Sequence, residues 1–540
     1  MASGYLILVL HAHLPYVRHP EQPYMFEELW LYEAITESYI PLIKILEGLE
    51  RDRIPCRLTL SLSPPLLTML QDRLLQQRYL KYLQERCALA RAELRRNRHD
   101  PVLKRLARMY LDRFTEAAEV FHIRYKNNLI SAFKRFYRAG LIELITTAAT
   151  HAFLPLLKVY PSTIRAQVMT GAEYFNHVFG HAAPGMWLPE CGYYEGLESY
   201  VREAGYRYLF LETHGLLYAE PRPRYGQWAP VACAQGVAAF CRDQEASRQI
   251  WSSTEGYPGD PLYREFYRDI GQDRDPAYLA RYVHPRGGGI QTGIKYFRIS
   301  GREEKDLYDP EMALHRAQEH AHHFVACRMS DIRDAAATMA LPPAITIPFD
   351  AELFGHWWFE GPWFLDALVR EVAQYSMTIE MITPSDYLGR HHDLQEVQPS
   401  GSSWGHCGYH DVWLNETNDW LYPYLHAACS QMEELAENQY RCQTLRYRAQ
   451  HQAARSLLLA QASDWPFIMR TGTTVEYARA RIRDHLSRFY YLARACETGR
   501  VHERTLAAIE RLDAIFPDID VCHFRSVAKP YPPTTPTGRP

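Results

Sequence analysis

The sequence predicts an α/β protein built on a parallel sheet, in which strands alternate with helices. Short apolar runs recur along the chain, long helical patterns lie between several of them, and polar side chains stand where the runs end. Strands that alternate with helices form βαβ units, whose strands are parallel. The 540 residues are enough for roughly two to four domains, although one α/β barrel can exceed about 250 residues.

The predicted strands are short runs rich in β-branched or aromatic residues. They cover residues 5–10, 57–62, 141–148, 184–189, 207–212, 345–349 and 378–383. The first run, YLILVL, follows no basic segment and leads into polar His11. We therefore interpret it as a strand rather than as a signal peptide.

Residues capable of chemistry stand at the carboxyl ends of these runs. They are His11, His13, His151, Glu190, His214 and Asp350. Active sites of α/β barrels lie at this edge of the sheet. A single histidine after a strand is more often a satisfied core residue, but such residues after successive strands predict one shared site.

Two stretches depart from the alternation. Residues 70–138 are charged and leucine-rich, with a turn at Asp100, and predict an inserted pair of amphipathic helices. After a polar linker, residues 418–515 are helical in pattern. The expected domains are a catalytic barrel over 1–395 with the insertion at about 70–138, a C-terminal helical domain over 396–526 that contributes to the cleft, and a disordered tail over 527–540.

Composition excludes several classes of protein. The 60 Lys and Arg against 63 Asp and Glu give a net charge of −3, which argues against nucleic-acid binding through a basic surface. No apolar run reaches the roughly 18 residues of a transmembrane helix. The 11 cysteines are scattered without a C-x-x-C pair, which indicates free thiols in a reducing cytoplasm. Aromatic residues make up 13% of the chain, enough for a core and also for a sugar-binding cleft.

Two carboxyl side chains have surroundings suited to acid catalysis. Glu190 follows the run GMWLP and Asp350 follows TIPF, and aromatic residues flank both. Partial desolvation raises the pKa of a carboxyl group. Two carboxyl groups about 5–5.5 Å apart on either side of one glycosidic bond are the minimal apparatus of a retaining glycosidase. The structural alternative for each is an ion pair with arginine or a helix cap.

Four ordered segments carry a resemblance to a known family: MWLPECGY, IWSSTEGYPGDPLYREFYRD, IPFDAELFGHWWFEGPWFL and SSWGHCGYHDVWLN. Together with HAHLP near the start and ASDWPF near residue 464, they make nearly the whole chain similar to glycoside hydrolase family 57, and within it to the 1,4-α-glucan branching enzymes. The resemblance implies a distorted, TIM-like (β/α)7 barrel with an inserted helical subdomain and a C-terminal α-helical domain.

The resemblance also implies roles for individual residues. Glu190 matches the family's nucleophile and Asp350 its general acid/base. The matches to substrate-binding residues are His11, His13, Trp30, His151, Trp251, Trp404, Trp413 and Asp464. The family's mobile loop falls within residues 240–256, where Phe240 is the expected aromatic tip. A tryptophan that some relatives carry after YREFYRD is absent, since Gly271-Gln272-Asp273 stands there.

These roles imply a retaining double displacement. Glu190 attacks C1 of an α-1,4-linked glucose while Asp350 protonates the departing chain, and Asp350 then deprotonates the acceptor. A 6-hydroxyl acceptor gives an α-1,6 branch, whereas water gives hydrolysis. We expect an α-1,4-glucan as donor and acceptor, no cofactor or metal, no nucleic-acid or membrane partner, and a monomer in the cytoplasm.

Other interpretations stay open at this point. Within the family they are an α-amylase and a 4-α-glucanotransferase. Outside it they are a metal-dependent enzyme similar to polysaccharide deacetylases, for which His11 and His13 would be ligands, and a glucan-binding protein without activity. No aspartate accompanies the two histidines in their motif, which argues against the metal. A further group on a helical stretch, predicted as surface or packing, comprises His315, His320, His322 and His323.

Overall fold

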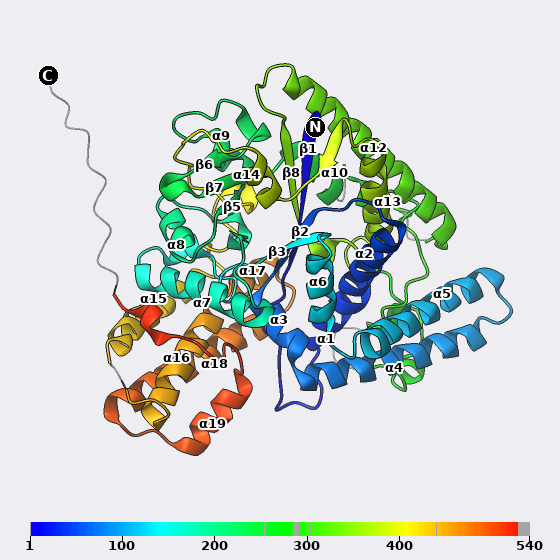
Figure 1. Cartoon of the computed structure of the whole chain (residues 1–540). Helices are drawn as coiled ribbons and strands as arrows, with labels where there is room; N and C mark the ends of the chain where they lie inside the picture. Colours follow the sequence, from blue (N-terminus) through cyan, green and yellow to red (C-terminus); the bar gives the residue numbers. More distant parts are fainter. Residues whose placement is uncertain (1, 253–254, 285–290, 302–304, 439, 527–540) are drawn as a thin grey trace. The chain divides into compact units, whose positions relative to one another are not determined.

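The computed structural model divides by packing into two compact units (Figure 1). It describes residues 2–252, 255–284, 291–301, 305–438 and 440–526. The first unit comprises Met1–Ile145, Leu216–Cys233 and Ala238–Gln398. The second comprises Thr146–Gly215, Ala234–Val237 and Pro399–Pro540. The predicted domain limits stay a prediction, and the predicted tail at 527–540 lies outside the described residues.

A parallel sheet forms the centre of the first unit. Its strands are β1 (Gly4–Ala12), β2 (Leu58–Leu62), β3 (Ile142–Ile145), β8 (Ala344–Asp350) and β9 (Ile379–Met381). The order is β3-β2-β1-β8, and β9 pairs with the beginning of β1. Every residue of β1 is buried. Its apolar run is therefore continuous rather than alternating, as in parallel sheets covered on both faces.

The second unit contains a short parallel pair. β4 (Gly185–Met186) lies beside β5 (Tyr208–Leu211), and Thr146, the residue after β3 in the chain, bridges Met186. A Cβ on Gly185 would lie 2.1 Å from the ring of Tyr208, so glycine is required at this strand. A strand is present in each of the segments predicted from the sequence, although β4 is much shorter than expected.

The first unit also has two strands that the sequence does not predict. β6 (Val231–Ala232) and β7 (Ala238–Cys241) are antiparallel, and Arg242 after β7 bridges Thr346 of β8. The expectation that Phe240 is the tip of a mobile loop is wrong, because Phe240 lies within β7 and is 1% exposed. These strands have only two and four residues, of which three are alanine, which is too short and too weak a pattern to predict from the sequence.

The inserted helices of the first unit are α4 (Arg73–Arg96) and α5 (Pro101–Ala118), which pack side by side (Figure 1). The carboxylates of Asp72 and Asp100 accept backbone N–H groups at their N-termini, as N-cap residues do. The other α-helices of this unit are α1 (Glu28–Ala34), α2 (Ile40–Asp52), α3 (Pro64–Gln71), α6 (Leu129–Arg138), α10 (Gln244–Trp251), α11 (Pro276–Leu279), α12 (Pro310–Ala336), α13 (Gly361–Gln374) and α14 (Pro384–Arg390).

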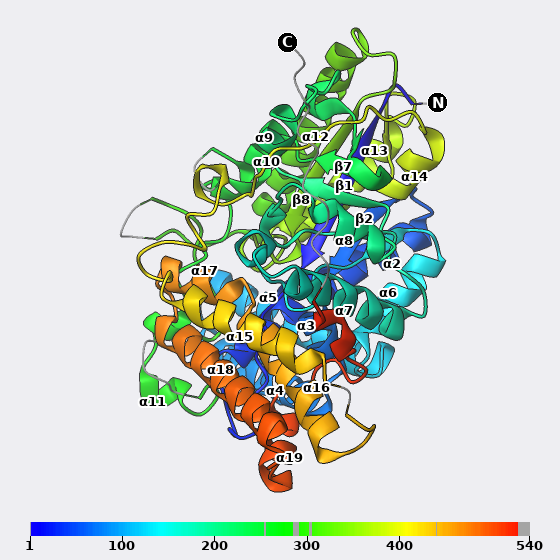
Figure 2. The same ribbon diagram turned by 90° about the vertical axis from the view of Figure 1, so that its left-hand side faces the viewer.

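In the second unit α15, α16 and α18 pack side by side (Figure 2). The α-helices of this unit are α7 (Pro161–Phe179), α8 (Leu197–Glu203), α15 (Leu421–Ala436), α16 (Leu445–Ala460), α17 (Asp464–Thr471), α18 (Val475–Thr498) and α19 (Glu503–Leu512). The helical pattern predicted over residues 418–515 is thereby confirmed. Helix α9 (Thr213–Leu217) crosses from one unit to the other along the chain.

Short helical turns connect these elements. Two are π-helical, η1 (Ile35–Tyr39) and η2 (Glu119–Arg124). The 3-10 turns are η3 (Leu154–Leu157), η4 (Pro189–Cys191), η5 (Gly226–Trp228), η6 (Ala234–Gly236), η7 (Tyr257–Gly259), η8 (Ile270–Gln272), η9 (Ala351–Leu353), η10 (His406–Gly408) and η11 (Val521–Phe524).

The histidines of α12 serve packing and the surface, as predicted. The ring of His320 stacks on Tyr257 with 4.4 Å between centroids, and His322 lies 2.7 Å from a carboxylate oxygen of Glu371. Among the described residues, no helix combines the length and the apolar character that crossing a membrane requires.

The close packing of α7 in the second unit is testable at Gly171. A Cβ there would lie 2.4 Å from the carbonyl oxygen of Thr147. We expect Gly171→Ala to lower the free energy of unfolding by about 1–3 kcal/mol, because backbone must move to admit the methyl group. Urea denaturation followed by circular dichroism measures the change.

The matched control is Gly48→Ala within α2, where the nearest atom to a new Cβ is a flexible guanidinium nitrogen of Arg370 at 3.6 Å. Alanine should raise the free energy of unfolding there by about 0.5–1 kcal/mol, because it is the better helix former. Equal stabilities for Gly171→Ala and the wild type would contradict the packing described.

Candidate active site

In the second unit Glu190 stands in a left-handed turn four residues after the end of β4. Its φ and ψ are 60° and 23°, within η4, and Cys191 follows with φ 51°. His151, after β3, has φ 58°. Non-glycine residues seldom adopt this conformation, and it clusters at functional sites where the surroundings enforce it. The direction of the Glu190 and His151 side chains is thus set by a left-handed backbone conformation.

Both carboxylate oxygens of Glu190 accept hydrogen bonds. The indole Nε1 of Trp404 donates to Oε2 at 2.7 Å, and the hydroxyl of Ser463 donates to Oε1 at 2.8 Å. The backbone N–H of Trp404 also donates to the carbonyl oxygen of Glu190 at 3.0 Å. The carboxylate is therefore fixed in position and in rotation.

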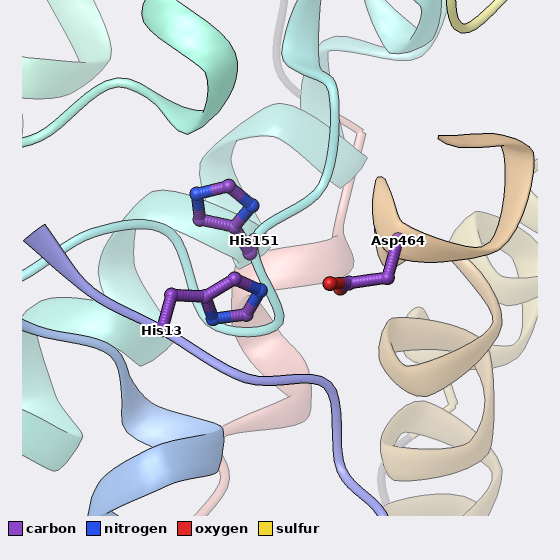
Figure 3. Close-up of side chains that lie close together, drawn as sticks. All are labelled: His13, His151 and Asp464. Atoms are coloured by element: carbon purple, nitrogen blue, oxygen red, sulfur yellow. The ribbon is translucent and has the colours of Figure 1, made fainter. Parts of the chain in front are cut away.

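His151 is part of the same network. Its Nδ1 lies 2.9 Å from the hydroxyl oxygen of Ser463 and 3.7 Å from Oε1 of Glu190. Because the serine hydroxyl donates to the carboxylate, the geometry assigns the Nδ1 proton of His151 to the bond with Ser463. Asp464 begins α17, and a carboxylate oxygen of it lies within 4.8 Å of a ring nitrogen of His151 (Figure 3).

The two predicted tryptophans of the C-terminal segment differ in exposure. Trp404 is half-buried and packs against Trp187 with 5.1 Å between ring centroids. Trp413 is 1% exposed and stacks on Phe153 at 4.3 Å. Trp413 therefore supports the interior of the second unit in this conformation, and its contact with substrate stays a prediction.

In the first unit the predicted histidines line the carboxyl edge of the sheet. The Nδ1 atoms of His11 and His13 lie 2.9 Å from the hydroxyls of Ser61 and Ser63 respectively. His11 is paired in register with Asp350 of β8. Burial, and then the charge of His13, lower the pKa of His11, so its ring is neutral. Polar side chains of β1, β2 and β8 thus lie at one edge of the sheet, and the single site shared by all six predicted residues stays a prediction.

Asp350 has a neighbouring carboxyl group that the sequence analysis missed. Burial raises the pKa of Asp350 to about 6, while the charges of His13 and Arg242 oppose the shift. Glu352, two residues further, has a pKa raised to about 7 by burial and then by the charge of Asp350. The hydroxyl of Tyr39 and the backbone N–H of His13 both donate to Oε1 of Glu352. Tyr39 ends η1, and π-helical turns often occur at functional sites.

Trp30, Trp251 and His214 are the remaining predicted residues. Trp30 is partly exposed on α1, and Trp251 ends α10 with 63% of its surface exposed. Their contacts with substrate stay predictions. His214 has a structural contact, because its Nε2 lies 2.8 Å from the carbonyl oxygen of Gly408.

The residues missed from the sequence are Ser463, Glu352 and Tyr39. Ser463 lies in the motif ASDWPF and Glu352 in the motif IPFDAELFGHWWFEGPWFL. Their positions beside Asp464 and Asp350 could have indicated a part in the site. Tyr39 gives no such signal, because its role depends on a π-helical turn that no local pattern predicts.

Carboxyl groups at the carboxyl ends of parallel strands are typical of a glycoside hydrolase. The family model of glycosyl hydrolase family 57 matches residues 7–398. That of the 1,4-alpha-glucan branching enzyme C-terminal region matches residues 424–524. The chain belongs to glycosyl hydrolase family 57, which confirms the resemblance seen in the sequence.

The similar proteins include an alpha-amylase and branching enzymes. The structure of the alpha-amylase AmyC from Thermotoga maritima has a TM-score of 0.91 and 40% identity, covering 97% of this chain and 100% of that one. The branching enzyme of Pyrococcus horikoshii has a TM-score of 0.88 and 32% identity over 98% of each chain. The 1,4-alpha-glucan branching enzyme of Thermococcus kodakarensis is 31% identical over 98% of this chain and 79% of the relative. These structures confirm the α/β class with a helical C-terminal region.

The buried carboxyl group of Glu352 makes stability depend on pH. The folded state keeps its proton up to about pH 7, whereas the ordinary pKa is 4.5. The folded state therefore binds more protons within this window, and the free energy of unfolding falls as the pH rises through it. We expect Glu352→Gln, whose amide oxygen still accepts both hydrogen bonds, to remove up to roughly 3 kcal/mol of this fall.

Urea midpoints at about pH 5 and about pH 8 measure the effect. Glu311→Gln on the exposed face of α12 is the control, because its side chain is 86% exposed and should leave the pH dependence unchanged. If Glu352→Gln keeps the full wild-type pH dependence, the buried carboxyl group does not cause it.

Proposed function

We propose that the protein is a 1,4-α-glucan branching enzyme that cleaves an α-1,4 linkage and transfers the released chain to a 6-hydroxyl. The match of residues 424–524 to the C-terminal region of branching enzymes carries this proposal. The identity to branching enzymes of Thermococcus kodakarensis and Pyrococcus horikoshii, over nearly the whole chain, supports it.

Glu190 is the proposed nucleophile. Its carboxylate is oriented by Trp404 and Ser463, and it attacks C1 of the donor glucose to form a glucosyl ester. Because attack uses one oxygen, the hydrogen bond to the other oxygen can persist through the reaction. Preorganised donors of this kind avoid reorganisation at the moment of reaction.

Asp350 is the proposed general acid and base. With a pKa of about 6 it can hold a proton for the leaving chain and later accept one from the 6-hydroxyl. His11, His13, His151, Trp30, Trp251, Trp404, Trp413 and Asp464 are the proposed substrate-binding residues.

The proposal includes a (β/α)7 barrel that places Glu190 and Asp350 at opposite sides of one glycosidic bond. The parallel strands and the polar residues at their carboxyl ends support this architecture. We further propose that the protein is a monomer in the cytoplasm. It uses an α-1,4-glucan as donor and acceptor and needs no cofactor or metal. The cysteines, all 11 free, support the reducing compartment.

Hydrolysis is the second candidate function, because the 40% identical structure from Thermotoga maritima is described as an alpha-amylase. The two activities share the glucosyl ester and differ in what resolves it. Water at about 55 M competes with a bound hydroxyl, whose effective molarity can reach about 10⁵ M when it is well oriented.

Incubation with amylose decides between the candidates. Branching shifts the iodine spectrum at constant reducing ends and creates linkages that a debranching enzyme releases, whereas hydrolysis increases the reducing ends. Glu190→Gln should lower either activity by at least about 10³-fold, while exposed Glu195→Gln should not change it. Activity that a chelator abolishes would favour the metal-dependent alternative, and unchanged turnover in Glu190→Gln would reject the nucleophile.

Ser463 tests the orientation of Glu190. We expect Ser463→Ala to lower kcat by about 10- to 100-fold with little change in KM, because a hydrogen bond to a charged group contributes about 1.5–3 kcal/mol. Ser456→Ala on α16 is the control, since the Ser456 hydroxyl is buried and has no hydrogen-bond partner within the described residues. Equal kcat values for Ser463→Ala and the wild type would show that the hydroxyl does not orient the nucleophile.

A further inference from the structure

The first unit has three neighbouring aromatic rings at its surface: those of Tyr267 and Trp357 are exposed, and that of Phe266, which contacts both, is half-buried. We propose that this aromatic platform is an additional binding surface for an α-glucan chain, separate from the residues assigned above. The identity of the ligand rests on the proposed function, whereas the surface itself is defined by its geometry.

The rings form one continuous set. Those of Phe266 and Trp357 are stacked, with 4.9 Å between centroids and 25° between planes. The ring of Tyr267 meets Phe266 edge-on at 5.1 Å. Trp357 is 57% exposed and Tyr267 is 78% exposed. Single exposed aromatic residues are common on protein surfaces and need no explanation, whereas two exposed rings in contact with a third offer a shared surface to a ligand.

The turn that carries Trp357 is held rigidly. Gly355 has φ 119°, and a Cβ there would lie 1.8 Å from the carbonyl oxygen of Glu37. The next residue, His356, pairs through Nδ1 with a carboxylate oxygen of Glu37 at 2.6 Å. The backbone N–H of Trp357 donates to the carbonyl oxygen of Glu352 at 3.2 Å. The indole is thus presented to solvent by a backbone with little freedom.

The segment that carries Phe266 and Tyr267 is equally constrained. The backbone N–H of Arg264 donates to the buried carboxyl group of Glu360 at 3.0 Å. The N–H of Tyr267 donates to Glu265 at 3.1 Å, and Glu265 pairs with Lys305 at 2.7 Å. The ammonium of Lys295 lies 4.3 Å from the centroid of the Phe266 ring, a cation–π distance.

Rigid and exposed aromatic faces suit a sugar polymer. The C–H faces of pyranose rings stack on indole and phenol rings, and the indole N–H and phenol O–H can bond to sugar hydroxyls. A preformed surface loses little conformational entropy on binding. Trp357 also follows Asp350 in the chain by seven residues, and its backbone N–H donates to the carbonyl oxygen of Glu352. A glucan chain held on the platform is therefore bound by the same segment that carries the proposed acid.

Affinity electrophoresis of the full-length protein through gels containing amylose tests the proposal. We expect Trp357→Ala to raise the dissociation constant for amylose about three- to tenfold and the double variant Trp357→Ala, Tyr267→Ala to raise it further. Trp357→Phe, which keeps a stacking ring, should restore most of the affinity. Tyr218→Ala is the control, because Tyr218 is also 57% exposed but its ring contacts the guanidinium of Arg222.

Activity on maltotriose, a short substrate with few sugar rings beyond the cleaved bond, separates catalysis from the binding of long chains on the platform. We expect its kcat/KM to be unchanged in Trp357→Ala. Wild-type retardation by amylose in Trp357→Ala and in the double variant would overturn the platform and leave the proposed function standing. A wild type that neither converts nor binds any glucan would overturn the proposed function, and retardation lost equally in Tyr218→Ala would overturn the assignment to this surface.

Discussion

The hydrogen bonds that Trp404 and Ser463 donate to Glu190 are the constraint on which the second unit's site depends. They join a strained turn after β4 to two segments more than 200 residues further along the chain. A left-handed glutamate is unfavourable by itself, so the surrounding bonds must hold it. His151, also left-handed, contacts the same serine and thereby connects the loop after β3 to the beginning of α17. One network therefore fixes the proposed nucleophile and orders the loops around it.

In the first unit the carboxyl groups tend to hold protons, whereas the carboxylate of Glu190 in the second unit accepts hydrogen bonds from neutral groups. Glu352 is buried and Asp350 half-buried, so desolvation raises the pKa of each carboxyl group, and the charge of Asp350 raises the pKa of Glu352 further. Tyr39 and the backbone of His13 satisfy Glu352 without supplying a full positive charge. This arrangement favours a proton in the site near neutral pH, which is what acid catalysis of glycoside cleavage needs. The free energy of unfolding falls as the pH rises because the folded state keeps this proton.

The chain is similar to enzymes named for branching and to one named for hydrolysis. On the proposed mechanism the two reactions differ only in what resolves the glucosyl ester. Both reactions need an oriented nucleophile and a protonated carboxyl group, the roles proposed for Glu190 and Asp350. The difference lies in how long the ester is shielded from water and how well an acceptor chain is oriented. Surfaces that bind polymer outside the reacting bond, such as the aromatic platform, act on that second quantity because they raise the local concentration of glucan chains.

The sequence alone determined the strand-forming runs and the inserted and C-terminal helices, because apolar periodicity is a local property. It also determined the family and the motifs that contain Glu190, Asp350 and Asp464, because ordered motifs can be read along the chain. The strands β6 and β7 are too short to give a pattern, and the resemblance to the family placed Phe240 on a loop, whereas it lies within β7. Only the tertiary structure decided that Ser463 bonds to Glu190, that Tyr39 reaches Glu352 from a π-helical turn, and that Trp413 is buried while Trp357 is displayed. These features depend on contacts between residues far apart in the chain, and no local pattern specifies such contacts.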